Sequence, residues 1–225
     1  MLKLNLDESI AGRWSGESVL ALFGMRECSA SKADLPALDE AIKSAIAEIR
    51  AQGRAVLDSP VLRRMRTTFR AMPDMDPTRY RPASEALIRR CLDKDIFRIN
   101  PLVDTNNLLS IRLQIPLGIY DIDRIEQSEW TYRVGREGES YLTISNQEKS
   151  ASGKLVIADL EGVIGSPVAD SGRAAIGSES KNILVIAYLP FDTGNEEAEG
   201  HLDLIESTFT NYIPSSGGFC QLLNL

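Results

Sequence analysis

The residues best suited to do chemistry gather between Arg98 and Asp121, in the run RINPLVDTNNLLSIRLQIPLGIYD. Leu108, Leu109 and Leu113 fall at helical spacing, so the run predicts a helix with polar side chains near its first turn. There, carboxylates could hold an ammonium group and amides could orient a water molecule at the edge of a pocket. The same acids could equally cap a helix or close a turn. The candidates are Asn100, Asp104, Thr105, Asn106, Asn107, Tyr120 and Asp121.

A second candidate segment is EGVIGSPVADSGR, which contains Gly162, Gly165 and Ser166. Glycines let a backbone approach a substrate closely and leave amide groups free to bind an oxyanion. A turn or bulge between two strands is the alternative interpretation of the Gly-x-x-Gly spacing. Other candidates for the same pocket are Glu161, Asp170 and Ser180.

The elements that position these residues follow from hydrophobic periodicity. A buried strand is predicted at 19–23, followed by a helix that Asp34 caps and Gly53 ends. Further helices begin after Ser59-Pro60 and after Pro82, and a last one covers about 196–212. Strands are predicted in WTYRV, SYLTI, KLVIADLEGVIG and KNILVIAYLP. We therefore expect one α+β domain over 1–225, with a helical N-terminal half packed on a mixed or antiparallel C-terminal sheet.

Charge is distributed unevenly along the chain. The net charge is -7, yet residues 41–98 hold 13 basic and 7 acidic side chains. Such asymmetry is typical of an RNA-binding surface on an otherwise acidic protein, although solvated faces of amphipathic helices give the same pattern. The arginines predicted to contact RNA are Arg63, Arg64, Arg81, Arg89 and Arg90.

Several classes of protein are disfavoured. No apolar run is long enough for a signal peptide or a membrane span, so a soluble, cytoplasmic protein is expected. Cys28, Cys91 and Cys220 fit reduced thiols better than a zinc site. His201 is the only histidine, and no nucleophile elbow, P-loop or dinucleotide fingerprint occurs. An enzyme without metal or cofactor would then need an already reactive bond as its substrate.

The two candidate segments together resemble the B3/B4 editing domain of the phenylalanyl-tRNA synthetase beta subunit. The first segment shares the order Asn, Val-Asp, Asn, Pro-Leu, aromatic and Asp, and the second resembles the family's Gly-Ile-Met-Gly-Gly segment and later Asn-Ile-Leu strand. The string Arg-Pro-x-Ser-Glu-x-Leu-x-Arg-Arg from Arg81 to Arg90 is similar to free-standing relatives of this domain. The chain departs from the synthetase pattern at Gly118, where the family has His, and at Ser166-Pro167-Val168, where it lacks the family's Glu.

The resemblance implies a B3/B4-like fold and a trans-acting deacylase that hydrolyses the ester of a mischarged tRNA. Amides near Gly165 and Ser166 would bind the oxyanion, Thr105, Asn106 and Asn107 would orient water, and Asp104 or Asp121 would hold the substrate ammonium group. A non-catalytic RNA-binding or interaction module and a small-molecule binding protein are the alternatives. Because Gly118 should open space and Asp104, Glu161 or Asp170 could line it, a cationic side chain such as that of canavanine is the candidate substrate.

Overall fold

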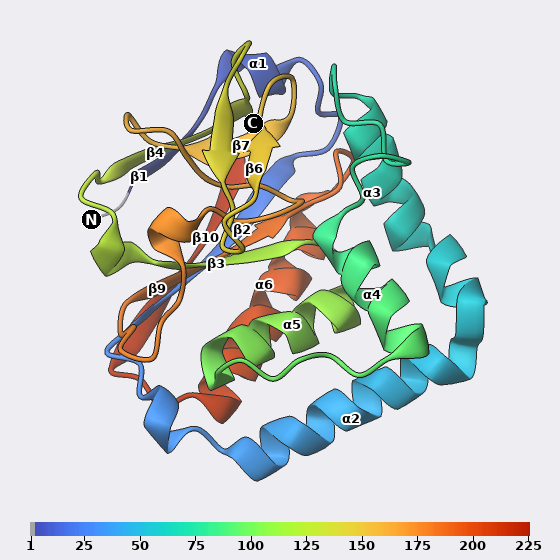
Figure 1. Ribbon diagram of the computed structural model, residues 1–225, viewed down its shortest axis with the longest axis vertical. Helices are drawn as coiled ribbons and strands as arrows, with labels where there is room; N and C mark the ends of the chain where they lie inside the picture. Colours follow the sequence, from blue (N-terminus) through green and yellow to red (C-terminus); the bar gives the residue numbers. More distant parts are fainter. Residues whose placement is uncertain (1–2) are drawn as a thin grey trace.

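The computed structural model describes residues 3–225, which form an α+β fold of two four-stranded sheets, a small hairpin and six α-helices (Figure 1). The helices are α1 (Glu8–Ala11), α2 (Leu35–Gln52), α3 (Pro60–Arg70), α4 (Ala83–Asp93), α5 (Pro101–Leu113) and α6 (Asn195–Tyr212). The strands are β1 (Lys3–Leu6), β2 (Ser18–Arg26), β3 (Leu117–Asp121), β4 (Glu129–Val134), β5 (Ser140–Leu142), β6 (Glu148–Ser150), β7 (Leu155–Ala158), β8 (Val163–Gly165), β9 (Ile183–Tyr188) and β10 (Gly217–Asn224).

The first sheet has the order β10-β2-β9-β3 and is antiparallel throughout. Every residue of β2 except Arg26 is buried, because one face of this sheet meets helices and the other meets the second sheet. On the helical side, the Phe23 ring lies 5.6 Å from the Phe209 ring of α6. A strand covered on both faces is expected to be continuously apolar, and the run VLALF fits this expectation.

The second sheet has the order β1-β4-β7-β8, with β1 and β4 parallel and the other pairs antiparallel. It packs on the first sheet through aromatic side chains. Tyr120 of β3 meets Trp130 of β4 edge to face at 5.9 Å, and Tyr132 of β4 lies 5.8 Å from Tyr188 of β9. The core of the molecule therefore continues across the junction of the two sheets.

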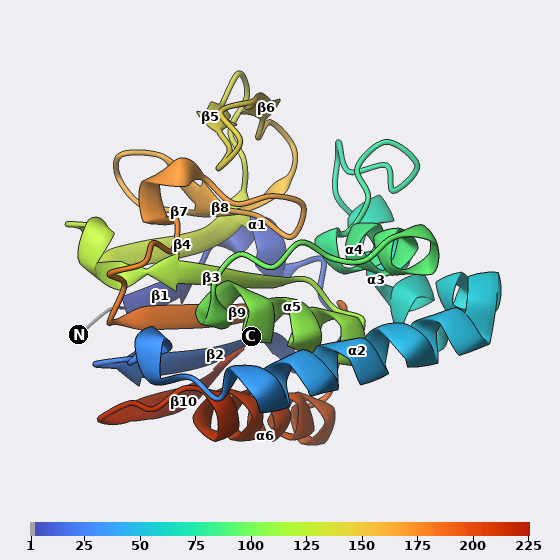
Figure 2. The ribbon, with the colours of Figure 1, turned by 60° about the horizontal axis from the view of Figure 1, so that its bottom comes forward.

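Helices α5 and α6 lie against the first sheet, and α2 runs along the outside of the helical layer (Figures 1 and 2). A second apolar cluster joins Leu38, Ile42 and Ile46 of α2 to Ile88 of α4 and Leu108 of α5. The predicted caps are confirmed, since the side chains of Asp34 and Ser59 accept hydrogen bonds from the amides of Ala37 and Leu62.

Three features of the fold differ from the sequence expectation. The N-terminal half contributes β1, which was not predicted, besides the predicted strand at 19–23, which lies within the longer β2. The run KLVIADLEGVIG is two strands, β7 and β8, separated by a turn in which Asp159 accepts hydrogen bonds from the amides of Glu161 and Gly162. Finally, LGIYD is the strand β3 and GGFCQLLN is the edge strand β10, neither of which the periodicity predicted.

Candidate functional site

A polar cluster lies at the junction of the two sheets, centred on the Tyr120 hydroxyl group. This hydroxyl donates to Asp170 Oδ1 at 2.7 Å and lies 2.6 Å from the Tyr188 hydroxyl. Because Tyr120 has one proton to donate, Tyr188 must donate to Tyr120 when Asp170 is ionised. Both tyrosine rings are fully buried, and their pKa values are raised well above the usual value, chiefly by burial. The two phenols are therefore neutral donors at physiological pH.

Asp170 is the titratable member of the cluster. Loss of hydration around its carboxyl group raises its pKa to about 7, against the lowering effect of the hydrogen bonds from Tyr120 and from the Ser166 amide. No cation pairs with Asp170 in residues 3–225. A carboxyl group in a poorly hydrated site without a cation is a common feature of binding and catalytic sites.

Gly118 and Gly165 flank the Tyr120 hydroxyl from two strands. A Cβ atom at either position would overlap this hydroxyl, and at Gly165 it would also crowd the Asp170 carboxylate. The expectation that Gly118 opens space is therefore wrong, because Tyr120 folds back over Gly118 and fills that volume. Both glycines are needed here because the tyrosine lies so close to their backbones.

Ser166 organises the turn that follows β8. Its hydroxyl donates to the Ala169 carbonyl oxygen at 2.9 Å and accepts from the amides of Val168 and Ala169. The Tyr141 hydroxyl of β5 lies 3.0 Å from Ser166 Oγ and donates to the same carbonyl. Of the two amides that the sequence suggested for an oxyanion, that of Ser166 already has a partner within the turn, because it donates to the Asp170 carboxyl group.

A cavity of about 220 Å³ adjoins this turn. It lies between the turn, the segment that follows α3 and the β5–β6 hairpin, and Figure 2 shows that hairpin projecting from the second sheet. Its walls include Met75, Tyr80, Tyr141, Lys154, Ser166 and Val168. The cavity is large enough for one amino-acid side chain, and Ser166 belongs both to its wall and to the Asp170 turn.

The polar residues of α5 divide into two groups. Asn106 lies near the cluster, because its Nδ2 donates to the Leu117 carbonyl oxygen of β3 and its buried Oδ1 has no partner in residues 3–225. Asn107 is half-buried one position further along. The others have structural contacts: Asn100 caps the helix, the Thr105 hydroxyl donates to the Pro101 carbonyl, and Asp104 accepts from Arg98 and the Ile99 amide.

The remaining predicted pocket residues are not gathered around Asp170. Asp121 Oδ2 accepts from Ser180 at 2.5 Å in a separate buried pair. Glu161 is exposed and forms an ion pair with Arg173 at 2.7 Å. Gly162 has a positive φ of 135°, a conformation that fits the turn between β7 and β8 and explains the glycine without a ligand.

The predicted tRNA-binding arginines are also not equivalent. Arg64 pairs with Asp192 and Glu197, and Arg81 and Arg89 share the buried carboxylate of Glu85 with a further arginine, Arg66. Arg63 is exposed and, within residues 3–225, forms no ion pair, and Arg90 contacts only a backbone carbonyl and an aromatic ring.

Sequence reasoning missed Tyr188, Tyr141 and Lys154, which lie on strands or next to one. Their types and spacing gave no signal, because the contacts join segments far apart in the chain. Across residues 3–225, no group of three or more His, Cys, Asp and Glu side chains is arranged to hold a metal ion. The helices described for this chain include none that is long and apolar enough to cross a membrane.

Comparison with known proteins points to one family. A family model described as B3/4 domain matches residues 68–195. Phenylalanine--tRNA ligase beta subunits from two strains of Streptococcus thermophilus are 26% identical over 109 residues, which is 47% of this chain but 14% of their own length. A crystal structure of an N-terminal fragment of the phenylalanyl-tRNA synthetase beta-subunit from Pyrococcus horikoshii aligns over 97% of this chain and 50% of that chain, with a TM-score of 0.48 and 12% identity.

The family model and the two ligase relatives confirm the resemblance that the two polar segments indicated. The family model covers more than half of the chain and includes β3, β8, the turn after β8 and β9, the elements that form the Tyr120–Asp170–Tyr188 cluster. The chain belongs to the B3/4 domain family.

Proposed function

We propose that this chain is a single editing-type domain that acts in trans as an aminoacyl-tRNA deacylase. The B3/4 family and the tRNA ligase relatives support a role that involves tRNA. The observation that carries the proposal is Asp170, a carboxyl group with no cation partner, held in the turn beside the cavity. A substrate with a cationic side chain would supply the partner that this carboxylate lacks.

The proposed chemistry is ester hydrolysis by positioned water. The water oxygen attacks the ester carbonyl carbon, the bond to the ribose oxygen breaks, and that oxygen takes up a proton as the free amino acid leaves. A neighbouring ribose hydroxyl would help to deprotonate the water, and Asn107 would orient it. The unpartnered Oδ1 of Asn106 would accept a hydrogen bond from the substrate. Holding water and ester in attack geometry supplies most of the acceleration.

For the substrate side chain, we propose a cationic group. Of the three acids considered for the pocket, Asp104 is paired with Arg98 and Glu161 with Arg173, so Asp170 is the one left to hold a cation. A guanidinium-like head such as that of canavanine would form charge-assisted hydrogen bonds with this carboxylate. Canavanine charged onto the arginine tRNA is therefore the preferred candidate.

The test is deacylation of canavanyl-tRNA for arginine against tyrosyl-tRNA for phenylalanine, with the same preparation and without added metal or nucleotide. We expect faster release of canavanine. A clear preference for the tyrosyl ester would refute the cationic specificity but not the reaction. If no mischarged tRNA in a panel is hydrolysed while tRNA still binds, the chain is a non-catalytic RNA-binding module.

The arginines give a separate prediction about tRNA affinity. Substituting Arg63→Gln should lower the slope of log affinity against log salt concentration by about one, because a free guanidinium releases a counterion from a phosphate on binding. Arg64→Gln should leave the slope unchanged, because Asp192 and Glu197 already bind that guanidinium. Titrations of labelled tRNA over a range of KCl concentrations measure both slopes. An equal change of slope in the two variants would show that the ion pairs do not determine which arginines contact RNA.

A further inference from the structure

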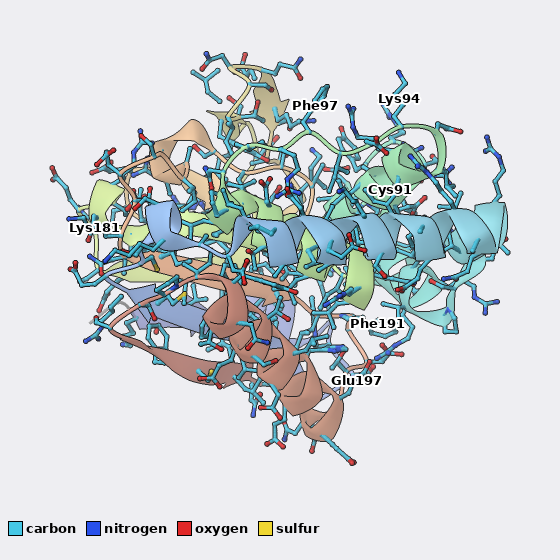
Figure 3. The ribbon with its side chains drawn as sticks, turned by 90° about the horizontal axis from the view of Figure 1, so that it is seen from below. Cys91, Lys94, Phe97, Lys181, Phe191 and Glu197 are labelled. Atoms are coloured by element: carbon cyan, nitrogen blue, oxygen red, sulfur yellow. The ribbon has the colours of Figure 1, made fainter. Side chains whose placement is uncertain are left out.

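An exposed aromatic side chain lies in the segment that joins α4 to α5. Phe97 is 73% exposed, and Ile99 beside it is 65% exposed, whereas Ile96 is buried against α2. Figure 3 labels Phe97 and Lys94 and shows both projecting from this segment toward the outside of the molecule. An exposed phenylalanine contributes nothing to the core, so its packing does not explain it.

Arg90 gives this ring a defined partner. Its guanidinium carbon lies 4.1 Å from the centre of the Phe97 ring, and its Nε donates to the Asp95 carbonyl oxygen at 3.2 Å. The hydrogen bond fixes the guanidinium plane, and the cation in turn fixes the ring. The result is a preformed flat surface rather than a freely rotating side chain.

Two cations close to Phe97 in the sequence are available to a ligand. In residues 3–225, neither Arg90 nor Lys94 pairs with a carboxylate, whereas the acids Asp39, Asp95 and Asp104 are paired with Arg98 or Arg50. Asp93, at the end of α4, is the nearby acid outside these pairs. An aromatic ring beside unpaired cations is the arrangement that proteins use to bind unpaired nucleotides, with the base on the ring and the phosphate on the cations.

The surface also faces the appropriate side of the molecule. Seen from below, the α4–α5 connection and the β5–β6 hairpin both lie in the upper part of the molecule (Figure 3). Figure 1 shows the hairpin near its top and the connection in its lower part, so the two share one face but are separated on it. That hairpin forms one wall of the cavity beside Ser166. A strand of RNA whose end enters the cavity would therefore pass on the side where Phe97 is exposed.

We propose that Phe97, backed by Arg90, is a stacking platform for an unpaired base of the tRNA, with Arg90 and Lys94 binding the adjoining phosphate. This inference rests on the proposed function because it takes tRNA as the ligand. It adds a contact outside the cavity that would select single-stranded over paired RNA. Phe97 is not part of the cavity wall, so it takes no part in the ester hydrolysis itself.

The experiment compares four Phe97 variants in binding to a short single-stranded RNA that ends in CCA. Phe97→Ala and Phe97→Leu should weaken binding about tenfold, because base stacking on an aromatic ring is lost. Phe97→Tyr and Phe97→Trp should keep wild-type affinity within about threefold, since an aromatic ring remains. The affinity for a blunt RNA duplex should be the same in all four variants, because the bases of a duplex are already stacked on each other.

Leu160→Ala is the matched control, because Leu160 is 91% exposed and lies between β7 and β8. Its affinity should equal that of the wild type. If Phe97→Leu binds single-stranded RNA as tightly as the wild type, the platform is refuted. It is also refuted if Leu160→Ala lowers the affinity for this RNA as much as Phe97→Ala does. This experiment is independent of the deacylase test, because the RNA probe carries no amino acid. If Phe97 contributes to RNA binding but no mischarged tRNA is hydrolysed, only the proposed function is contradicted.

Discussion

Asp170→Asn should lower kcat/KM for deacylation of the canavanyl ester on the order of 100-fold, because truncating one partner of a desolvated charge pair removes most of its binding energy. The loss should appear mainly in KM, since Asp170 binds the substrate cation rather than the attacking water. The amide keeps a hydrogen-bond acceptor for Tyr120, so the tyrosine contacts survive. Steady-state kinetics on the mischarged tRNA measure both constants.

The pH dependence gives this prediction a second readout. Because burial raises the pKa of Asp170 to about 7, the wild-type KM should fall as pH rises through about 7 and the carboxylate forms. A raised carboxyl pKa also means that the native state is relatively less stable above its folded pKa, so stability should decline as pH rises from the ordinary Asp pKa of about 4 toward 7. In the Asp170→Asn variant, neither KM nor stability should change with pH in this way, because the amide does not titrate.

Glu161→Gln is the control, since Glu161 is exposed and paired with Arg173. Its kinetic constants should match those of the wild type at every pH. Unchanged kinetics in Asp170→Asn, or an equal loss in Glu161→Gln, would contradict the assignment of the substrate cation to Asp170.

Glu85→Gln should lower the free energy of unfolding by about 2 to 3 kcal/mol, because it removes one partner of a buried ion pair. Glu85 is buried and accepts from Arg66 at 2.8 Å and Arg89 at 2.9 Å, with Arg81 at 3.6 Å. Arg81 and Arg89 are more than a third exposed and contribute little, so most of the loss comes from Arg66, whose charge stays half-buried without its partner.

The stability contributed by Glu85 also depends on pH. Burial alone would raise its pKa, but the hydrogen bonds from Arg66 and Arg89 hold the pKa below the usual value. A depressed pKa stabilises the native state above the ordinary Glu pKa of about 4.3, and this contribution is lost as pH falls below it. Urea unfolding at neutral and acidic pH measures it. Glu48→Gln on the exposed face of α2 serves as the control. An equal decrease in the free energy of unfolding in the two variants would refute the prediction.

Local signals were sufficient for the longer helices, whereas the four-residue α1 was not predicted. Asp34, Ser59-Pro60 and Pro82 mark where three helices begin, because caps and prolines act within a few residues of the chain. The strand β3 was missed because five residues, all buried, carry neither alternation nor length. The edge strand β10 contains two glycines and is mostly exposed, so it has no apolar face for a periodicity to reveal.

For the candidate site, the sequence selected the segments but not the contacts. Asn106, Gly165 and Asp170 lie in the two segments that the resemblance singled out, and the structure brings all three near β3. The role of Tyr120 could not be predicted, because its hydroxyl meets partners 50 and 68 positions away in the chain. In contrast, Arg81 and Arg89 lie four positions before and after Glu85, so helical spacing did carry a signal for that ion-pair group.

The position of β2 has a consequence for how this protein folds. This strand comes early in the sequence, whereas its two neighbours in the sheet, β9 and β10, are synthesised much later. During synthesis, the apolar run VLALF therefore lacks its partner strands while α2 to α5 are made. Pairing across such a sequence separation carries a high loop-closure entropy, so we expect slow folding limited by the arrival of β9. Until then, the exposed edges of β2 are the part of the nascent chain most prone to aggregate and most in need of a chaperone.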